Sequence, residues 1–204
     1  EYPTSVELRG YTEDTSYEVP AVWEAAEALF AAQRPLLFVG GGVVLSDTAN
    51  YVREILALTG VPSVATLMGL GGVAAETEGF TGMAGMHGAY ASNMAIQECD
   101  LLLAVGTRFS DRVTGNTAAF APKARIVHFD IDPAELNKNV RADIPVIGDL
   151  RQTLPAFVDI IKNSAQEELP SRFRSWMGEV LLMERAHPLG WKASADIRPE
   201  ELIS

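Results

Sequence analysis

Two arginines and an aspartate follow an uncharged apolar run in the middle of the chain. Leu101–Val105 is followed by Gly106, and Arg108, Asp111 and Arg112 come within the next six residues. Such a run predicts a strand buried on both faces of a parallel sheet, because helices cover both sides of these sheets. Since ligands bind beyond the carboxyl ends of parallel strands, the arginines are candidates for binding an anion. A solvated loop with mutually neutralising charges explains this segment equally well.

A glycine triplet follows another apolar run, Leu36–Val39. Gly40, Gly41 and Gly42 carry no side chains, which lets backbone N–H groups approach a phosphate closely. The dinucleotide fingerprint G-x-G-x-x-G is incomplete, because Leu45 stands where its third glycine belongs. Taken alone, this motif is better explained as a plain tight turn.

Two carboxylates close later apolar runs. Asp130 ends the segment 125–130, 24 residues after Gly106, and a Rossmann-type domain places an acid near this spacing to bind ribose hydroxyls. Asp130 is equally well placed to cap a helix beginning near Pro133. Asp149 follows Gly148 after the segment 144–147. Glycine, arginine and acid at successive strand ends favour a nucleotide-containing cofactor lying across the edge of the sheet.

Methionine, glycine and histidine are concentrated in the segments 66–73 and 82–88. Glycine-rich segments pack poorly as a core, whereas Met68, Met83 and Met86 offer polarisable contacts to an aromatic ring system. His87 can add a hydrogen bond or a stacking contact, although a lone histidine is more often structural. We expect His128 and His187 to be structural.

Apolar strands alternate with helical patterns along most of the chain. This alternation predicts an α/β fold, a doubly wound, Rossmann-like parallel sheet of five to six strands with helices on both faces. We expect Ser46 to cap a helix over 49–56, and Pro155 to delay the start of the helix after Asp149 until about Thr153. The expected strands are 36–39, 61–66, 101–105, 125–130 and 144–147, and the other expected helices are 22–30, 90–97 and 171–184.

Composition restricts the class of partner. The 204 residues carry a formal net charge of -11, which would repel nucleic acid and anionic membranes, so an anionic ligand must be small and held by a local cationic patch. No stretch approaches the ~20 apolar residues of a membrane span, and we expect a cytoplasmic protein. Cys99 has no metal-binding neighbours and is expected to pack in the core. The start at Glu1 is interpreted as that of a piece excised from a longer polypeptide.

Several motifs together resemble the acetohydroxyacid synthase (acetolactate synthase) family. The resemblance covers nearly the whole chain, in order, and is to the central FAD-binding domain of the large catalytic subunit. It rests on LLFVGGG at 36–42, TLMGLG at 66–71, GMHG at 85–88, QECDLLLAVGTRFSDRVTG at 97–115, FAPKARIVHFDIDPAELNKN at 120–139 and VIGD at 146–149. The closing IRPEELI at 197–203 resembles the entry to the family's third domain.

The resemblance implies a division of the chain and an activity of the whole protein. Residues 1–20 would be a linker from a missing thiamine-binding domain, 21–163 the FAD domain, and 164–204 a helical strap towards a missing diphosphate-binding domain. The family condenses two 2-ketoacids with loss of CO2 in branched-chain amino acid biosynthesis, using thiamine diphosphate and Mg2+ held by the other domains. We expect this fragment to contain no catalytic residue and no metal site, and to be inactive alone. A homo-oligomer and a small regulatory subunit are the implied partners.

The resemblance also implies individual contacts. Arg112 would bind the acceptor ketoacid, with Asp111 orienting it and Met86 beside it, whereas Ser110 stands where many family members carry aspartate. Glyoxylate carboligase, pyruvate oxidase and a non-catalytic FAD-binding or assembly module are the alternatives. The implied FAD contacts are Gly40, Gly41, Gly42, Thr66, Leu67, Met68, Gly85, Met86, His87, Gly106, Thr107, Arg108, Arg112, Val113, Asp130, Ile131, Asp149 and Leu150.

Overall fold

Six parallel strands form one sheet in the order β3-β2-β1-β4-β5-β6. The computed structural model describes residues 17–164 and 168–190. The predicted doubly wound α/β fold is confirmed, and this strand order is that of dinucleotide-binding domains. The strands are β1 (Pro35–Val39), β2 (Ser63–Ala65), β3 (Phe80–Met83), β4 (Leu101–Val105), β5 (Arg125–Asp130) and β6 (Ile144–Ile147).

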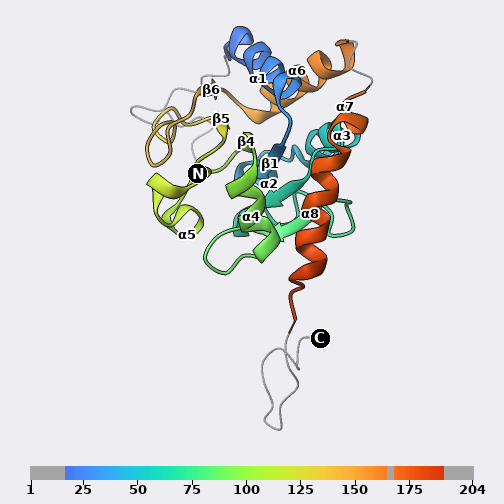
Figure 1. Ribbon diagram of the computed structural model, residues 1–204. Helices are drawn as coiled ribbons and strands as arrows, with labels where there is room; N and C mark the ends of the chain where they lie inside the picture. Colours follow the sequence, from blue (N-terminus) through green and yellow to red (C-terminus); the bar gives the residue numbers. More distant parts are fainter. Residues whose placement is uncertain (1–16, 165–167, 191–204) are drawn as a thin grey trace, which may run out of the picture.

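Helices cover both faces of the sheet, because successive side chains of each strand point to opposite sides. In β4, Leu101 and Leu103 belong to one apolar core, and Leu102 and Ala104 belong to the other. The first core is covered by α1 (Val19–Ala31), α3 (Ala49–Thr59) and α6 (Leu150–Asn163), and the second by α4 (Tyr90–Glu98) and α8 (Arg174–Ala186). Figure 1 shows α1 beside α6, and α8 running past α4.

Short helices follow several strand ends. They are α2 (Gly41–Leu45) after β1, η1 (Leu67–Gly69) after β2, α5 (Asp111–Thr114) after β4, and further along the chain η2 (Thr117–Ala119) and α7 (Leu169–Arg172). In the part of the chain that the structure describes, no helix combines the length and apolarity that a membrane span requires.

Helix α8 packs on the same sheet face as α4. The Trp176 indole is buried and its Nε1–H donates to the Pro35 carbonyl at 2.9 Å, while Arg34 forms an ion pair with Glu179 at 2.7 Å. These contacts tie α8 to the amino end of β1. The assignment of 164–204 to a strap remains a prediction, and 197–203, like 1–16 of the predicted linker, lies outside the described residues.

Some sequence-based expectations are wrong in detail. Strand β3 lies in a glycine-rich stretch where no strand was expected, because a four-residue edge strand containing Gly82 carries no alternating pattern. Ser46 does not cap α3. It ends α2 instead, and Thr48 precedes α3 without a capping hydrogen bond from its side chain.

The expected start of α6 is also wrong, and the alternative that Asp130 caps a helix is excluded. Helix α6 begins at Leu150 and contains Pro155, because Asp149 caps its first turn by accepting the Arg151 N–H at 2.8 Å. This cap offsets the one hydrogen bond that Pro155 cannot donate. Asp130 caps no helix near Pro133, because its carboxylate accepts the Asp132 N–H at 3.0 Å in a turn.

Candidate functional site

All six strands present their carboxyl ends at one edge of the sheet, because every pairing is parallel. The strand order reverses between β1 and β4, which is where open α/β sheets bind ligands. The structure brings every predicted contact segment to this edge: 40–42 after β1, 66–68 after β2, 85–87 after β3, 106–108 with 112–113 after β4, 130–131 at the end of β5, and 149–150 after β6. We call this the carboxyl edge.

The glycine triplet brings the ends of β1 and β4 into backbone contact. The Gly40 N–H donates to the Val105 carbonyl at 2.8 Å, and the Gly42 N–H donates to the Gly106 carbonyl at 2.9 Å. A Cβ on Gly40 would lie 2.1 Å from the Gly106 oxygen, so no other residue fits there. Two of the triplet's N–H groups are thus bonded to the end of the neighbouring strand, and the packing of β1 on β4 explains Gly40 and Gly42.

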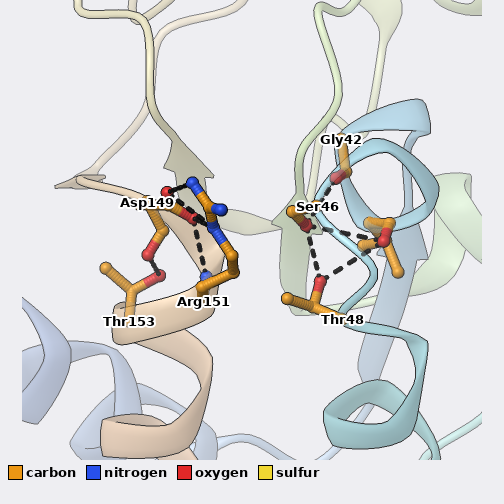
Figure 2. Close-up of polar contacts among 7 residues, drawn as sticks. Gly42, Ser46, Thr48, Asp149, Arg151 and Thr153 are labelled. Atoms are coloured by element: carbon orange, nitrogen blue, oxygen red, sulfur yellow. Dashed lines mark hydrogen bonds and ion pairs between the residues drawn. The ribbon is translucent and has the colours of Figure 1, made fainter. Parts of the chain in front are cut away.

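Hydroxyl groups hold the chain directly after the triplet. The Ser46 hydroxyl donates to the Gly42 carbonyl at 2.7 Å and lies 2.8 Å from the Thr48 hydroxyl. Figure 2 shows this network linking the two ends of α2 to the start of α3. In the next loop, the Thr66 hydroxyl accepts the Gly69 N–H at 3.0 Å and so closes η1. Part of the backbone in both loops is therefore hydrogen-bonded by side chains of the chain itself.

The buried side chain of His128 lies next to two of the predicted contact residues, Thr107 and Asp130. Its Nε2 donates to the Thr107 carbonyl at 2.7 Å and lies 3.7 Å from a carboxylate oxygen of Asp130. The ring is fully buried and packs edge-on against Phe109, and Nδ1 has no hydrogen-bond partner among the described residues. The sequence predicted a structural histidine. The structure places it where it holds the loop after β4 against the end of β5.

Asp149 forms the cap of α6 and an ion pair within it. Its carboxylate accepts from the backbone N–H and the guanidinium of Arg151, and its own carbonyl accepts the Thr153 hydroxyl at 3.2 Å (Figure 2). Hydrogen bonding from Arg151 lowers the pKa of Asp149, so this nearly buried carboxyl is ionised at neutral pH. The last strand therefore ends in a fixed negative charge.

The cationic and substrate candidates are exposed at the same edge. Arg108, His87 and Met86 face solvent, and Arg112 and Asp111 keep 77% and 87% of their side chains exposed. The Arg112 Nε lies 3.8 Å from Asp111, a loose contact that contributes little as an exposed ion pair. Arg112 is therefore available to an incoming anion.

Large apolar side chains are unusually exposed along this edge. Buried cores normally take such residues, and a cluster left in solvent marks a surface that something covers. The exposed members that end or follow strands include Leu67 (65%), Met68 (73%), Leu70 (42%), Met86 (67%), Ile131 (57%) and Ile147 (40%). An edge with apolar side chains, arginines and two acids suits a ligand that carries both ring systems and phosphates.

One contact was missed in the sequence. Asn93 of α4 hydrogen-bonds both backbone groups of Gly85, and both residues line a pocket of about 350 Å³ with Met86, Asp111 and Arg112. No spacing pattern marks Asn93, since its partner is a backbone whose position only the fold determines. Within 17–164 and 168–190, no group of three His, Cys, Asp or Glu residues could hold a metal ion.

Known proteins resemble this chain over 66% to 99% of its residues. It is 38% identical over 99% of its residues to the acetolactate synthase large subunit of Mycobacterium tuberculosis, of which it covers 33%. It is 52% identical over 66% of its residues to the acetolactate synthase isozyme 2 large subunit of Escherichia coli, covering 25% of that protein. A probable acetolactate synthase large subunit of Methanocaldococcus jannaschii is 44% identical over 74% of the chain, which covers 26% of it.

The chain thus spans between a quarter and a third of the length of these relatives. The family described as thiamine pyrophosphate enzyme, central domain, matches residues 22–157, which run from α1 into α6 and include every strand of the sheet. This chain belongs to that family of central domains.

Proposed function

We propose that this chain is the FAD-binding central domain of an acetolactate synthase large subunit. The observation that carries the proposal is the set of exposed apolar and cationic side chains at the carboxyl edge, in a chain whose relatives are named acetolactate synthase large subunits. In the whole protein, thiamine diphosphate and Mg2+ would be held by other domains, and two 2-ketoacids would condense with loss of CO2. A homo-oligomer with a small regulatory subunit, in the cytoplasm, completes the proposal.

The residues at the edge fit the parts of FAD. Arg108 is an exposed cation at the turn after β4 and suits the pyrophosphate, and Asp130 suits the ribose hydroxyls. Met68 and Met86 present polarisable side chains to a flat ring system. Because the condensation transfers no net electrons, the flavin would act as a structural element that organises these loops.

Arg112 is proposed to recognise the carboxylate of the acceptor ketoacid. A guanidinium pairs with a carboxylate through two parallel hydrogen bonds, which an ammonium group cannot reproduce. Replacing Arg112 with lysine in the full-length enzyme is expected to impair use of the acceptor more than loading of thiamine diphosphate. Equal losses in both would reject this role.

Flavin titration tests the cofactor assignment. The purified protein is expected to be yellow or to quench FAD fluorescence on titration, and Arg108→Gln is expected to weaken binding by roughly tenfold to a hundredfold, as loss of one charged hydrogen bond. Arg174→Gln, at an exposed position of α8, is the matched control and should bind FAD as the wild type does. Failure of the full-length protein to bind FAD would refute the proposal.

The alternative function is a module that binds FAD or contacts a neighbouring domain without chemistry. The isolated chain is expected to behave in this way, because we propose that the other domains supply the reacting cofactor. Acetolactate formation from pyruvate by the isolated 204-residue chain would contradict that expectation.

A further inference from the structure

Asn93 joins α4 to the loop after β3 by both functions of its side-chain amide. The Gly85 N–H donates to Asn93 Oδ1 at 2.8 Å, and Asn93 Nδ2 donates to the Gly85 carbonyl at 3.0 Å. The side chain thus pairs with one residue's backbone as a neighbouring strand would. Gly85 is buried and has φ +112, a conformation that a side chain would strain.

The same loop holds the helix that carries Arg112. The Met86 N–H donates to the Arg112 carbonyl at 2.9 Å. A Cβ on Gly85 would lie 2.6 Å from that carbonyl oxygen, so the two backbones are in direct contact. Three links therefore run in series, from Asn93 to Gly85, to Met86 and to Arg112.

We propose that Asn93 is a positioning residue that couples the Met86 segment to Arg112 and thereby sets recognition of the acceptor 2-ketoacid. The proposal deepens the function proposed above and rests on it. Asn93 touches neither the proposed flavin nor the substrate directly in this scheme. It acts by fixing the backbone from which the Arg112 side chain reaches the substrate.

The coupling is separable from the stability of α4. Ser92, the neighbouring residue, donates to the Thr81 carbonyl at 2.7 Å and lies 2.9 Å from the Thr81 hydroxyl, which fixes α4 on β3 independently. Ala91, Ala95 and Ile96 bury the inner face of the helix. Loss of the Asn93 amide therefore leaves the Gly85 N–H without its acceptor while α4 stays in place, and the Gly85 carbonyl keeps its bond from the Gly88 N–H at 2.9 Å.

Asp and Ala test different parts of the amide. Asn93→Asp keeps the shape and the acceptor for the Gly85 N–H but opposes a carboxylate to the Gly85 carbonyl, because an ionised carboxylate donates no hydrogen bond. Asn93→Ala removes both bonds and creates no charge. Asn50→Asp on the exposed surface of α3 is the matched control.

The experiment measures amide hydrogen exchange and steady-state kinetics of the full-length enzyme. In both Asn93 variants we expect exchange at Gly85 and at Met86 to quicken at least tenfold. The KM for the acceptor ketoacid should rise at least fivefold while kcat stays within twofold. FAD affinity should change less than the acceptor KM, and Asn50→Asp should match the wild type throughout.

Distinct results would overturn the proposal. Faster exchange at Gly85 alone, with Met86 still protected, would show that the links are not in series. A fall in kcat at constant KM would show that Arg112 positioning is not what Asn93 controls. A wild-type enzyme that forms no acetolactate would refute the proposed function and the recognition role with it, whereas the exchange of Met86 would still decide whether Asn93 holds the loop.

Discussion

Replacing Gly40 with alanine tests whether β1 can pack against β4 only with a glycine at this position. The new Cβ would lie 2.1 Å from the Gly106 oxygen and 2.6 Å from the Thr107 Cα. Cβ contacts in proteins do not fall below 3.0 Å, so the strand ends must separate by 3.0 minus 2.1, or 0.9 Å. Neither neighbour is a flexible side chain that could rotate away, and the separation must therefore distort backbone.

The cost follows from overpacking and from the hydrogen bond at the same residue. Overpacking in a dense core destabilises by about 1–3 kcal/mol, and a rigid backbone neighbour places this case near 3 kcal/mol. Stretching the bond from the Gly40 N–H to Val105, 2.8 Å long, adds about 1 kcal/mol. For a chain of this size each kcal/mol moves Tm by roughly 2–4 °C, so Tm should fall by roughly 8–16 °C.

Gly178 provides the matched control. It lies within α8, and an added Cβ would meet no atom within 4 Å. Because alanine loses less backbone entropy than glycine in a helix, Gly178→Ala should raise stability by about 0.5–1 kcal/mol. Thermal unfolding of the two variants of the 204-residue chain, without added flavin, should therefore shift in opposite directions.

A Gly40→Ala protein that unfolds within 2 °C of the wild type would refute the packing argument, a threshold set at about 1 kcal/mol. If that variant were stable but failed to bind FAD, the glycine would serve the ligand instead. Both measurements are needed, because a phosphate cradle and a close strand contact demand the same residue for different reasons.

Three further substitutions or probes test other contacts. Asp149→Ala should lower the free energy of unfolding by about 1 kcal/mol through loss of the α6 cap, and Asp149→Asn should lower it by less. Because the pKa of Asp149 is lowered in the folded protein, the stability that depends on its charge is complete above about pH 4 and is lost as pH falls through the folded pKa, which unfolding at several pH values would detect. Burial raises the pKa of the Cys99 thiol to about 12, so a thiol reagent at pH 8 should label it only after unfolding, and rapid labelling of the folded chain would contradict its burial. Trp176→Ala should cost about 3–5 kcal/mol in urea unfolding, and an unchanged midpoint would show that α8 is dispensable to the domain.

Hydrophobic patterns within short segments of the sequence predicted most of the strands correctly. The bounds of β4, β5 and β6 agree with the sequence prediction, because each is a mainly apolar segment that ends at or before a glycine or an aspartate. Strand β3 was not predicted, because an edge strand that contains a glycine has no clear hydrophobic pattern and forms by pairing with its neighbour β2. The predicted start of α6 near Thr153 was wrong, because the cap at Asp149 stabilises the first turn by more than the one hydrogen bond that Pro155 cannot donate.

The residues of the candidate site likewise fall into those that the sequence could predict and those that it could not. The residues with charged or polarisable side chains, such as Arg112 and Met86, could be named from their types and their place after strands. Asn93 could not, because its importance comes from the Gly85 backbone eight residues earlier, and a backbone position leaves no mark in composition.

By itself the sequence determined where five of the six strands form and which chemistry follows each of them, because alternation, apolar runs and turn residues act over a few neighbouring positions. Only the tertiary structure decided that β1 lies beside β4, that the Gly40 N–H pairs with Val105, and that the loop after β3 supports Arg112. Those contacts join residues distant along the chain, and they form only when burial of both sheet faces brings the strand ends together.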